Sequence, residues 1–248
     1  MGRPLVDRSV CPRCGARRLA AAAETPLCPS CLFAVALSAT DTQDDPAAVV
    51  DDPPYDIVTI LARDAEAVTY LARGFMSSEH IALKVIDVPD VDVIVSRARE
   101  WKTRLTNARH RGISRLIDAG AAGRGRAYLA TEYVAGSSLD YLLRHGFLEA
   151  ANRIDIARQL ADALAAMHDL GLAHMRIDSS RVKVATSGGV QATLLGIGTS
   201  LIVTGSLPQP DLDVRALVEL CSTLGVPVPA RPYATMGSLR AALQDIVA

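Results

Sequence analysis

Two kinds of hydrophobic pattern divide the chain after residue 54. Short runs that alternate between apolar and polar residues, or stay apolar with many β-branched side chains, predict strands. Segments with an apolar residue every three or four positions predict helices. The strand-like runs cover residues 55–61, 67–72, 81–88, 113–119 and 127–134, and one helical segment, 91–108, interrupts them. An antiparallel sheet with one inserted helix is therefore expected over residues 55–134.

The rest of the chain is predicted to be mainly helical. In the segment 151–170, Leu160 and Met167 belong to one apolar stripe, and charged residues surround that stripe. A loop at residues 174–178 follows, and two apolar runs separated by a Ser-Gly-Gly turn then predict a hairpin. The expected fold class is α+β, with a sheet-rich part ahead of a helical part.

Composition and charge argue against several kinds of partner and location, and they leave the expected fold unchanged. Half of the 248 residues are apolar and the formal net charge is −1, so a large core is expected and a polyanion is not the expected main partner. No run of 18 apolar residues exists, and the amino-terminal residues lack an apolar secretory core. A soluble, cytoplasmic protein that does not bind membranes is the resulting expectation.

Two Cys-x-x-Cys pairs lie ahead of the predicted sheet. Cys11 and Cys14 form the first pair, and Cys28 and Cys31 form the second after thirteen intervening residues. Four thiolates at this spacing suit a tetrahedral zinc ion. Two disulfides or four redox thiols are the alternatives, but neither suits a cytosolic chain. Structural zinc in a small ribbon-like module at residues 1–37 is therefore expected.

The role of this module is predicted from its charge. Arg13, Arg17 and Arg18 are the only basic cluster nearby, and no aromatic residue is interleaved with them to stack on bases. A structural or protein-docking module is therefore favoured over nucleic-acid binding.

The acidic, proline-containing residues 38–54 are typical of a linker. The fifth cysteine, Cys221, lies on an apolar helix face and is predicted to be a core residue.

The order of helix, loop, hairpin and Gly-x-Gly over residues 168–200 resembles the catalytic segment of the eukaryotic-like protein kinases. In that family the loop reads H-R-D-x-K-x-x-N, and D-F-G follows the hairpin. His174 keeps the first position, but Arg176 takes the place of the proton-accepting Asp, and Arg181 takes that of the metal-binding Asn. The carboxylate of D-F-G falls on Gly196.

The resemblance therefore implies a fold without its usual chemistry. A guanidinium cannot accept a proton at physiological pH, and it repels the magnesium ion that an asparagine would help to bind. Asp178, at the position of the loop lysine, is the one carboxylate placed to act as a substitute base. We predict a pseudokinase that is not an enzyme, with Arg176, Arg181 and Gly196 as degenerate positions and no catalytic residue.

The glycine-rich loop of the family falls on residues 61–70. Its three glycines are replaced by Ala62, Asp64 and Ala67, so the backbone has lost the freedom to approach phosphates closely. Asp64 and Glu66 also add negative charge where a triphosphate would lie. On both grounds ATP is not an expected ligand.

One nucleotide-binding residue of the family is retained. Residues 81–84 match the V-A-I-K strand, so Lys84 stands where a lysine would reach the phosphates, as a vestigial site. An ordinary lysine facing solvent is the alternative. Glu100 is the candidate partner on the next helix, but the family spacing places Trp101 there, and one residue turns a helix by about 100°.

Later segments extend the resemblance. Residues 131–136 resemble the hinge of the family, residues 211–217 resemble the start of its large buried helix, and Arg231 heads a segment that resembles a late helix. The helices usually found between the last two are missing. We expect a two-lobed kinase-like fold, similar to bacterial members of the family, with an amino lobe at residues 55–134 and a truncated carboxy lobe at residues 135–248.

Two functions from different classes follow from the resemblance. The first is a catalytically inactive regulatory or scaffolding module that binds another protein, such as an active kinase or another signalling component. The second is a Ser/Thr protein kinase or ATP-responsive switch with weak, non-standard nucleotide binding through Lys84 and Asp178. An oligomer is left open, because a shortened carboxy lobe could leave apolar helix faces uncovered. We predict the first function.

Overall fold

The computed structural model describes Cys11 and residues 55–63, 67–74, 79–106, 110–186, 189–196 and 198–246. The predicted linker and, except for Cys11, the predicted zinc module lie outside these residues. Among the helices that are described, none is both long and apolar enough to cross a bilayer.

The first half of the described chain is a five-stranded antiparallel sheet in the order β1-β2-β3-β5-β4. Its strands are β1 (Tyr55–Arg63), β2 (Ala67–Gly74), β3 (His80–Asp87), β4 (Leu116–Ala121) and β5 (Arg126–Glu132). The strand β3 is central, and its Lys84 is paired with Thr69 of β2 and Leu129 of β5. Lys84 is therefore fixed in the middle of the sheet.

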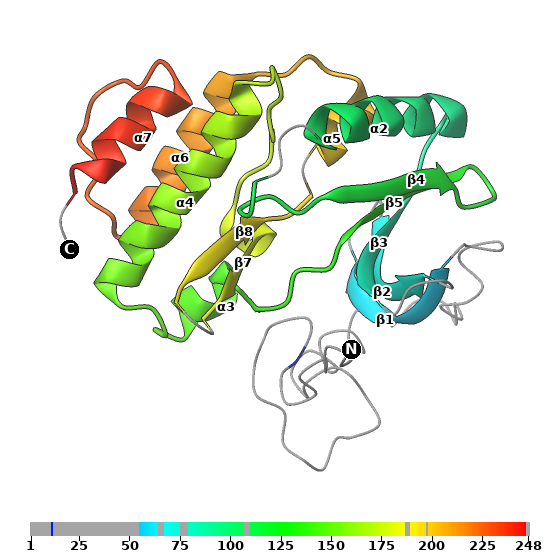
Figure 1. The fold of residues 1–248 in the computed structure, drawn as a ribbon, viewed down its shortest axis with the longest axis horizontal. Coiled ribbons are helices and arrows are strands. Elements are labelled where there is room, and N and C mark those ends of the chain that lie inside the picture. Colours follow the sequence, from blue (N-terminus) through cyan, green and yellow to red (C-terminus); the bar gives the residue numbers. More distant parts are fainter. Residues whose placement is uncertain are drawn as a thin grey trace, which may run out of the picture.

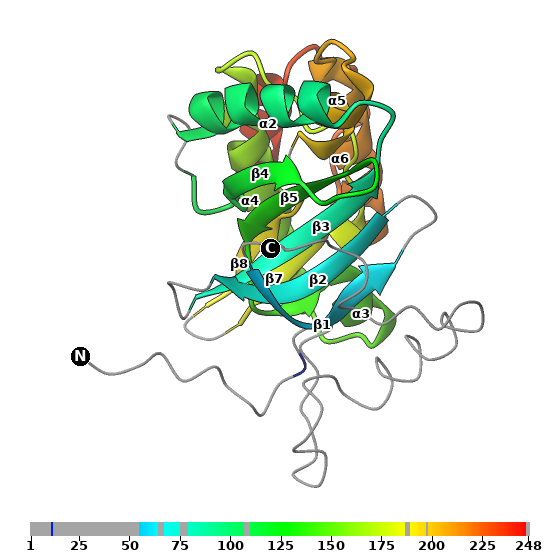
Figure 2. The ribbon, with the colours of Figure 1, turned by 90° about the vertical axis from the view of Figure 1, so that its right-hand side faces the viewer.

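The two faces of this sheet are buried by different partners, because successive side chains of a strand alternate between them. On one face, Leu83 and Val85 pack in a small cluster with the fully buried Tyr70. On the other face, Ile86 joins the main core together with helix α2 (Val91–Thr106). Figure 2 shows α2 lying along the β4 side of the sheet.

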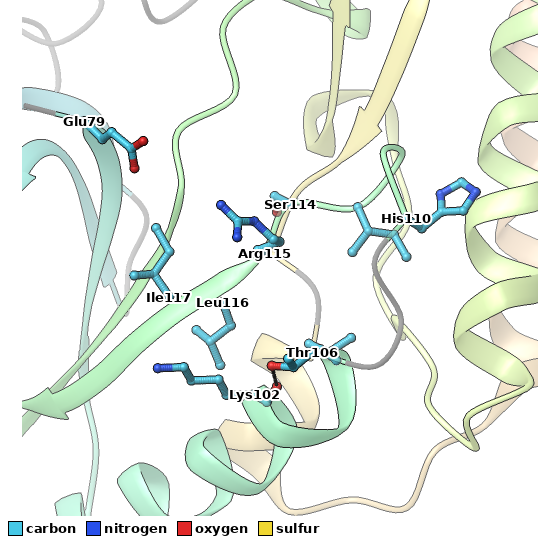
Figure 3. A pocket seen from close by; sticks show the side chains of 10 residues that line it. Glu79, Lys102, Thr106, His110, Ser114, Arg115, Leu116 and Ile117 are labelled. Atoms are coloured by element: carbon cyan, nitrogen blue, oxygen red, sulfur yellow. Dashed lines mark hydrogen bonds between the residues drawn. The ribbon is translucent and has the colours of Figure 1, made fainter.

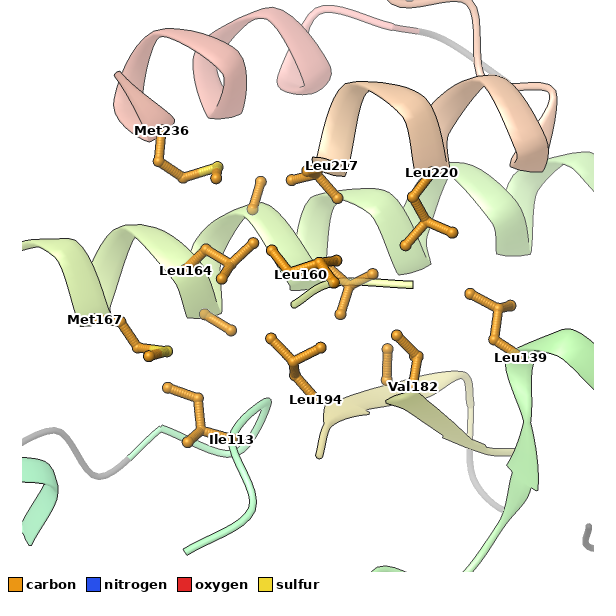
Figure 4. Packing of buried hydrophobic residues seen from close by; sticks show 14 of the residues in the cluster. Ile113, Leu139, Leu160, Leu164, Met167, Val182, Leu194, Leu217, Leu220 and Met236 are labelled. Carbon is orange, nitrogen blue, oxygen red and sulfur yellow. The ribbon is translucent and has the colours of Figure 1, made fainter. Parts of the chain in front are cut away.

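The second half of the described chain is built around α4. Its helices are α3 (Leu139–Arg144), α4 (Ala150–His168), α5 (Thr199–Thr204), α6 (Pro210–Leu224) and α7 (Met236–Gln244), and a second antiparallel sheet consists of β6 (Ser137–Ser138), β7 (Val182–Ala185) and β8 (Gln191–Leu194). Figure 1 shows α4, α6 and α7 side by side. In Figure 4, Leu160 and Leu164 of α4 lie between Leu217 of α6 and Leu194 of β8. The apolar stripe predicted for α4 is thus the centre of the core.

The structure confirms the α+β organisation, with a sheet-rich lobe ahead of a helical lobe. It differs from the expectation at α5, which the sequence pattern does not predict. This helix has six residues, and it lies between Gly198 and Gly205, whose φ angles of 70° and 69° are left-handed. A helix of fewer than two turns, bounded by two glycines, is too short to display a hydrophobic period.

Candidate active site

A buried carboxylate from α6 holds the loop that follows α4. Asp213 is fully buried, and it accepts hydrogen bonds from the backbone N–H groups of His174 and Met175, both at 2.7 Å. The Nε2 atom of His168, the last residue of α4, lies 3.0 Å from the same carboxylate. Met175 has a φ of 67°, which is unusual for a residue with a side chain. Asp213 therefore holds the loop in a conformation that local preference disfavours.

His174 is oriented by hydrogen bonds at both ring nitrogens. Its Nδ1 atom accepts from the backbone N–H of Arg176 at 3.3 Å, and its Nε2 atom donates to the carbonyl oxygen of Leu195 at 2.9 Å. This arrangement requires the neutral tautomer with its proton on Nε2. Burial lowers the pKa of His174, and the hydrogen bond to Leu195 opposes this shift more weakly. Both ring nitrogens are occupied, so the role of His174 is structural.

Two of the degenerate catalytic positions, Arg181 and Gly196, lie side by side next to Asp178. Asp178 caps the short 3₁₀ helix η2 (Ser179–Arg181) and accepts from the backbone N–H of Ser180 at 2.8 Å. The Nε atom of Arg181 lies 3.5 Å from a carboxylate oxygen of Asp178. Gly196 is next to them, because a Cβ atom there would lie 3.3 Å from the Arg181 guanidinium. The structure thus brings Asp178, Arg181 and Gly196 together.

These residues differ in what their chemistry allows. The Asp178 side chain is 48% exposed, whereas the Arg181 side chain is 19% exposed and Arg176 is on the surface. Of these three side chains, only the Asp178 carboxylate can accept a proton. Arg181 and Gly196 supply no side-chain oxygen, and magnesium requires oxygen ligands. The residues at these positions therefore do not fit the magnesium ion that the kinase resemblance implies.

The contact between the amino lobe and this segment is made by a tryptophan. Lys84 is half-buried and lies on the sheet face that also carries Ile86. On the neighbouring helix α2, Glu100 is exposed and Trp101 is buried. A Cβ atom on Gly198 would come within 2.5 Å of the Trp101 ring, so the ring packs directly on Gly198. The inward position of α2 therefore belongs to Trp101 rather than to Glu100.

The segment after β5 is tied to β7 by a buried lysine. Lys183 is 8% exposed, and its Nζ atom donates to the carbonyl oxygen of Gly136 at 3.1 Å. Gly136 has a φ of 136°, and a Cβ atom there would lie 2.6 Å from the carbonyl oxygen of Val184, so only glycine fits. Sequence analysis assigned no role to Lys183 or Asp213. For Lys183 the available signal was a charged residue within an apolar run, and for Asp213 it was the resemblance of residues 211–217 to the start of a buried helix.

Cys11 is the one predicted zinc ligand that the structure describes. It is buried, and it lies close enough to Tyr133 for its charge to act on the phenol group. Burial raises the pKa of Tyr133 above its ordinary value, and the Cys11 charge raises it further. Cys14, Cys28 and Cys31 lie outside the described residues. Within the described ranges, no group of three or more His, Cys, Asp or Glu side chains is arranged to hold a metal ion.

Comparison with known proteins gives relatives of one kind. No protein-family model matches the sequence. The chain is 28% identical over 197 residues, 78% of its length, to the serine/threonine-protein kinase Pkn2 of Myxococcus xanthus. It is 31% identical over 149 residues, 58% of its length, to a probable serine/threonine-protein kinase of Clostridium acetobutylicum. It is 25% identical over 153 residues, 60% of its length, to the serine/threonine-protein kinase PrkC of Bacillus subtilis. The chain covers 23%, 22% and 24% of these relatives, about a quarter of each.

A solved structure has the same architecture. The kinase domain of Mycobacterium tuberculosis PknI matches 81% of this chain and 99% of that domain, with a TM-score of 0.59 and 19% sequence identity. The chain has a protein kinase fold. In this kinase-like fold, the sheet β1–β5 with α2 forms the amino lobe, and α3–α7 with the second sheet form the carboxy lobe.

The prediction that the chain is not an enzyme is wrong. The relatives are named serine/threonine-protein kinases, which contradicts this prediction, and the solved kinase domain supports the fold. The prediction depended on the replacements at Arg176, Arg181 and Gly196. Those replacements argue against the standard arrangement of magnesium ligands. They do not affect Lys84 or the Asp178 carboxylate, which the kinase-like fold retains.

Proposed function

We propose that this chain is an ATP-responsive, Ser/Thr-kinase-like enzyme that binds nucleotide weakly and without magnesium. Lys84 contacts the phosphates from the amino lobe, and Arg181 contacts them from the carboxy lobe. The observation that carries the proposal is the placement of the Arg181 guanidinium beside Gly196 and 3.5 Å from the Asp178 carboxylate. A cation thus stands where the resemblance expects a metal ion, and a proton acceptor stands next to it.

The charge of the triphosphate explains why a guanidinium suits this position. In kinases, metal ions neutralise the phosphate oxygens during transfer. A guanidinium offers planar, paired N–H donors that match a phosphate group, and it is always charged. Gly196 has no side chain, and a Cβ atom at this position would lie only 3.3 Å from a terminal nitrogen of Arg181. Arg181 therefore supplies positive charge and direct hydrogen bonds where a metal ion would otherwise supply charge and coordinate the phosphate oxygens.

Asp178 is the proposed base. It would take the proton from a serine or threonine hydroxyl as the hydroxyl oxygen attacks the terminal phosphorus and ADP leaves. Its exposed fraction of 48% leaves the carboxylate open to a substrate from solvent. Another protein is the proposed partner, as the sequence predicts, whether it acts as the substrate or as a regulated component.

Thermal melts with ATP test the binding step. ATP without magnesium is expected to stabilise the protein, by about 2.7 kcal/mol at a hundred times its dissociation constant. Lys84→Ala is expected to abolish the shift, since the phosphates lose one of their two cations. Arg99→Ala, an exposed cation on α2, is the matched control and keeps the shift. No shift in any condition, or a shift only with magnesium, contradicts the proposal.

Transfer is measured on the same samples with ATP labelled at its terminal phosphate and a serine-rich protein substrate. Asp178→Asn is expected to lower the labelling rate by about a hundredfold or more, since an amide cannot accept the proton. Asp155→Asn on the exposed side of α4 should leave the rate unchanged. Equal rates for wild-type protein and Asp178→Asn would remove Asp178 from the mechanism.

We also propose that Cys11, Cys14, Cys28 and Cys31 hold a structural zinc ion, on the support of their spacing. Metal analysis of purified protein is expected to find about one zinc per chain, and Cys11→Ser is expected to lose it. Cys221→Ser is the control and retains zinc, because Cys221 is buried and burial raises its pKa to about 12. A metal content that does not change with Cys11→Ser contradicts the site.

A further inference from the structure

A cavity of about 340 Å³ lies outside the kinase-like site, beside the carboxy-terminal half of α2. Its walls come from α2, from the residues that follow α2, from the start of β4 and from Glu79, just before β3 (Figure 3). Lys84, Asp178 and Arg181 are not among the residues that line it. Cavities of this volume accommodate small organic ligands. The cavity is therefore a candidate binding site separate from the proposed nucleotide site.

The inner wall of this cavity is apolar except for one hydroxyl group. Leu105, Ile113 and Leu116 are buried there. Ser114 is 2% exposed, and its backbone N–H donates to the carbonyl oxygen of Leu194 at 3.1 Å. Its Oγ atom has no hydrogen-bond partner among the residues that the structure describes. A buried hydroxyl without a partner is unfavourable, and such groups in native proteins usually have an explanation. A ligand atom in the cavity would supply the missing partner.

Two cations approach the cavity from different elements. Lys102 is exposed on α2, and in the part of the chain that the structure describes no carboxylate pairs with it. Arg115, just before β4, uses its Nε atom to contact Glu132 at 3.2 Å, and its two terminal nitrogens have no partner among the described residues. Figure 3 shows Lys102 extending from the helix and Arg115 extending from the opposite wall. Both line the cavity, and both carry N–H donors that suit an anionic ligand.

The histidine that lines the cavity is engaged elsewhere. The Nε2 atom of His110 lies 3.1 Å from the Asp162 carboxylate, and its Nδ1 atom accepts from the backbone N–H of Gly112 at 3.1 Å. Figure 3 shows its ring turned toward α4. Recognition of an anion therefore depends on Lys102 and Arg115.

We propose that this cavity binds a small organic anion with an apolar body. The body lies on the three buried leucine and isoleucine side chains, and a phosphate or carboxylate group is held by Lys102 and Arg115. A polar atom of the ligand completes the hydrogen bonding of Ser114. This site is independent of the proposed nucleotide site.

Titration calorimetry of the full chain in magnesium-free buffer tests this site with simple probes. Phenyl phosphate and benzoate carry both an apolar ring and an anionic group, whereas phenol lacks the anion and inorganic phosphate lacks the ring. The two aromatic anions are expected to bind at least about tenfold more tightly than phenol or inorganic phosphate. The affinity ratio between phenyl phosphate and benzoate then identifies the preferred anionic group.

Variants separate this cavity from the nucleotide site. Lys102→Ala is expected to weaken phenyl phosphate binding by about tenfold or more, and Ser114→Ala is expected to weaken it by less. Arg99→Ala, an exposed cation on the same helix, should leave binding unchanged, as should Lys84→Ala. Absence of binding by both aromatic anions would overturn the proposal. Equal binding of phenol, or loss of binding in Lys84→Ala instead of Lys102→Ala, would overturn it as well.

Discussion

Asp213→Asn is expected to lower the free energy of unfolding by about 3 kcal/mol, because a fully buried carboxylate loses its complementary donors. The carboxylate receives two backbone N–H groups, from His174 and Met175, and lies 3.0 Å from His168. An amide has one oxygen and one NH₂ group, so at least one of these donors would face another donor. The loop at Met175 should then lose its left-handed conformation.

Urea unfolding measures this effect, and Asp211→Asn is the matched control two residues earlier on α6. Asp211 is exposed and pairs with Arg215 one turn along the helix, so its replacement is expected to change stability by less than about 0.5 kcal/mol. If the two variants unfold at the same urea concentration, Asp213 does not anchor the loop.

Gly198→Ala is the second substitution with a large expected effect. The φ of 70° at this residue disfavours any side chain, and the new methyl group would lie 2.5 Å from the Trp101 ring. Strain at the backbone contributes about 1 kcal/mol, and overpacking contributes about 1–3 kcal/mol. A loss of about 2–4 kcal/mol in the free energy of unfolding is therefore expected by the same urea measurement.

Two further variants separate these contributions. Gly146 has a φ of 66° but no atom within 4 Å of an added Cβ, so Gly146→Ala should show only the backbone contribution of about 1 kcal/mol. In a Trp101→Leu background, Gly198→Ala should also fall to about 1 kcal/mol, because the ring that it strikes is gone. An unchanged cost in that background would place the clash elsewhere.

The sequence predicted the elements whose side chains repeat with a clear period. The apolar stripe of α4 and the alternation of β3 persist over enough residues to identify a helix and a strand, and both are confirmed. Helix α5 was missed because its six residues are held by tertiary packing and by two left-handed glycines rather than by a period. Local pattern does not contain that information.

Only those residues of the candidate site that belong to a local sequence motif could be predicted. Lys84 and the loop from His174 to Arg181 could be located by resemblance, because their spacing is local. The position of Asp213 beneath that loop could not, because the two segments are joined only by folding. The cavity lined by Lys102, Ser114 and Arg115 had no motif at all, since its walls come from α2 and from the start of β4, which only folding brings together.

The packing of Trp101 on Gly198 gives the protein an optical reporter. The sequence contains one tryptophan, and its side chain is largely shielded from water. An indole in an apolar environment fluoresces at shorter wavelength than one in water, so the tryptophan emission of the whole chain comes from the joint between α2 and the segment that begins α5. Any ligand or partner that moves α2 away from Gly198 would shift this emission to the red, and the movement could be followed in solution without a chemical label.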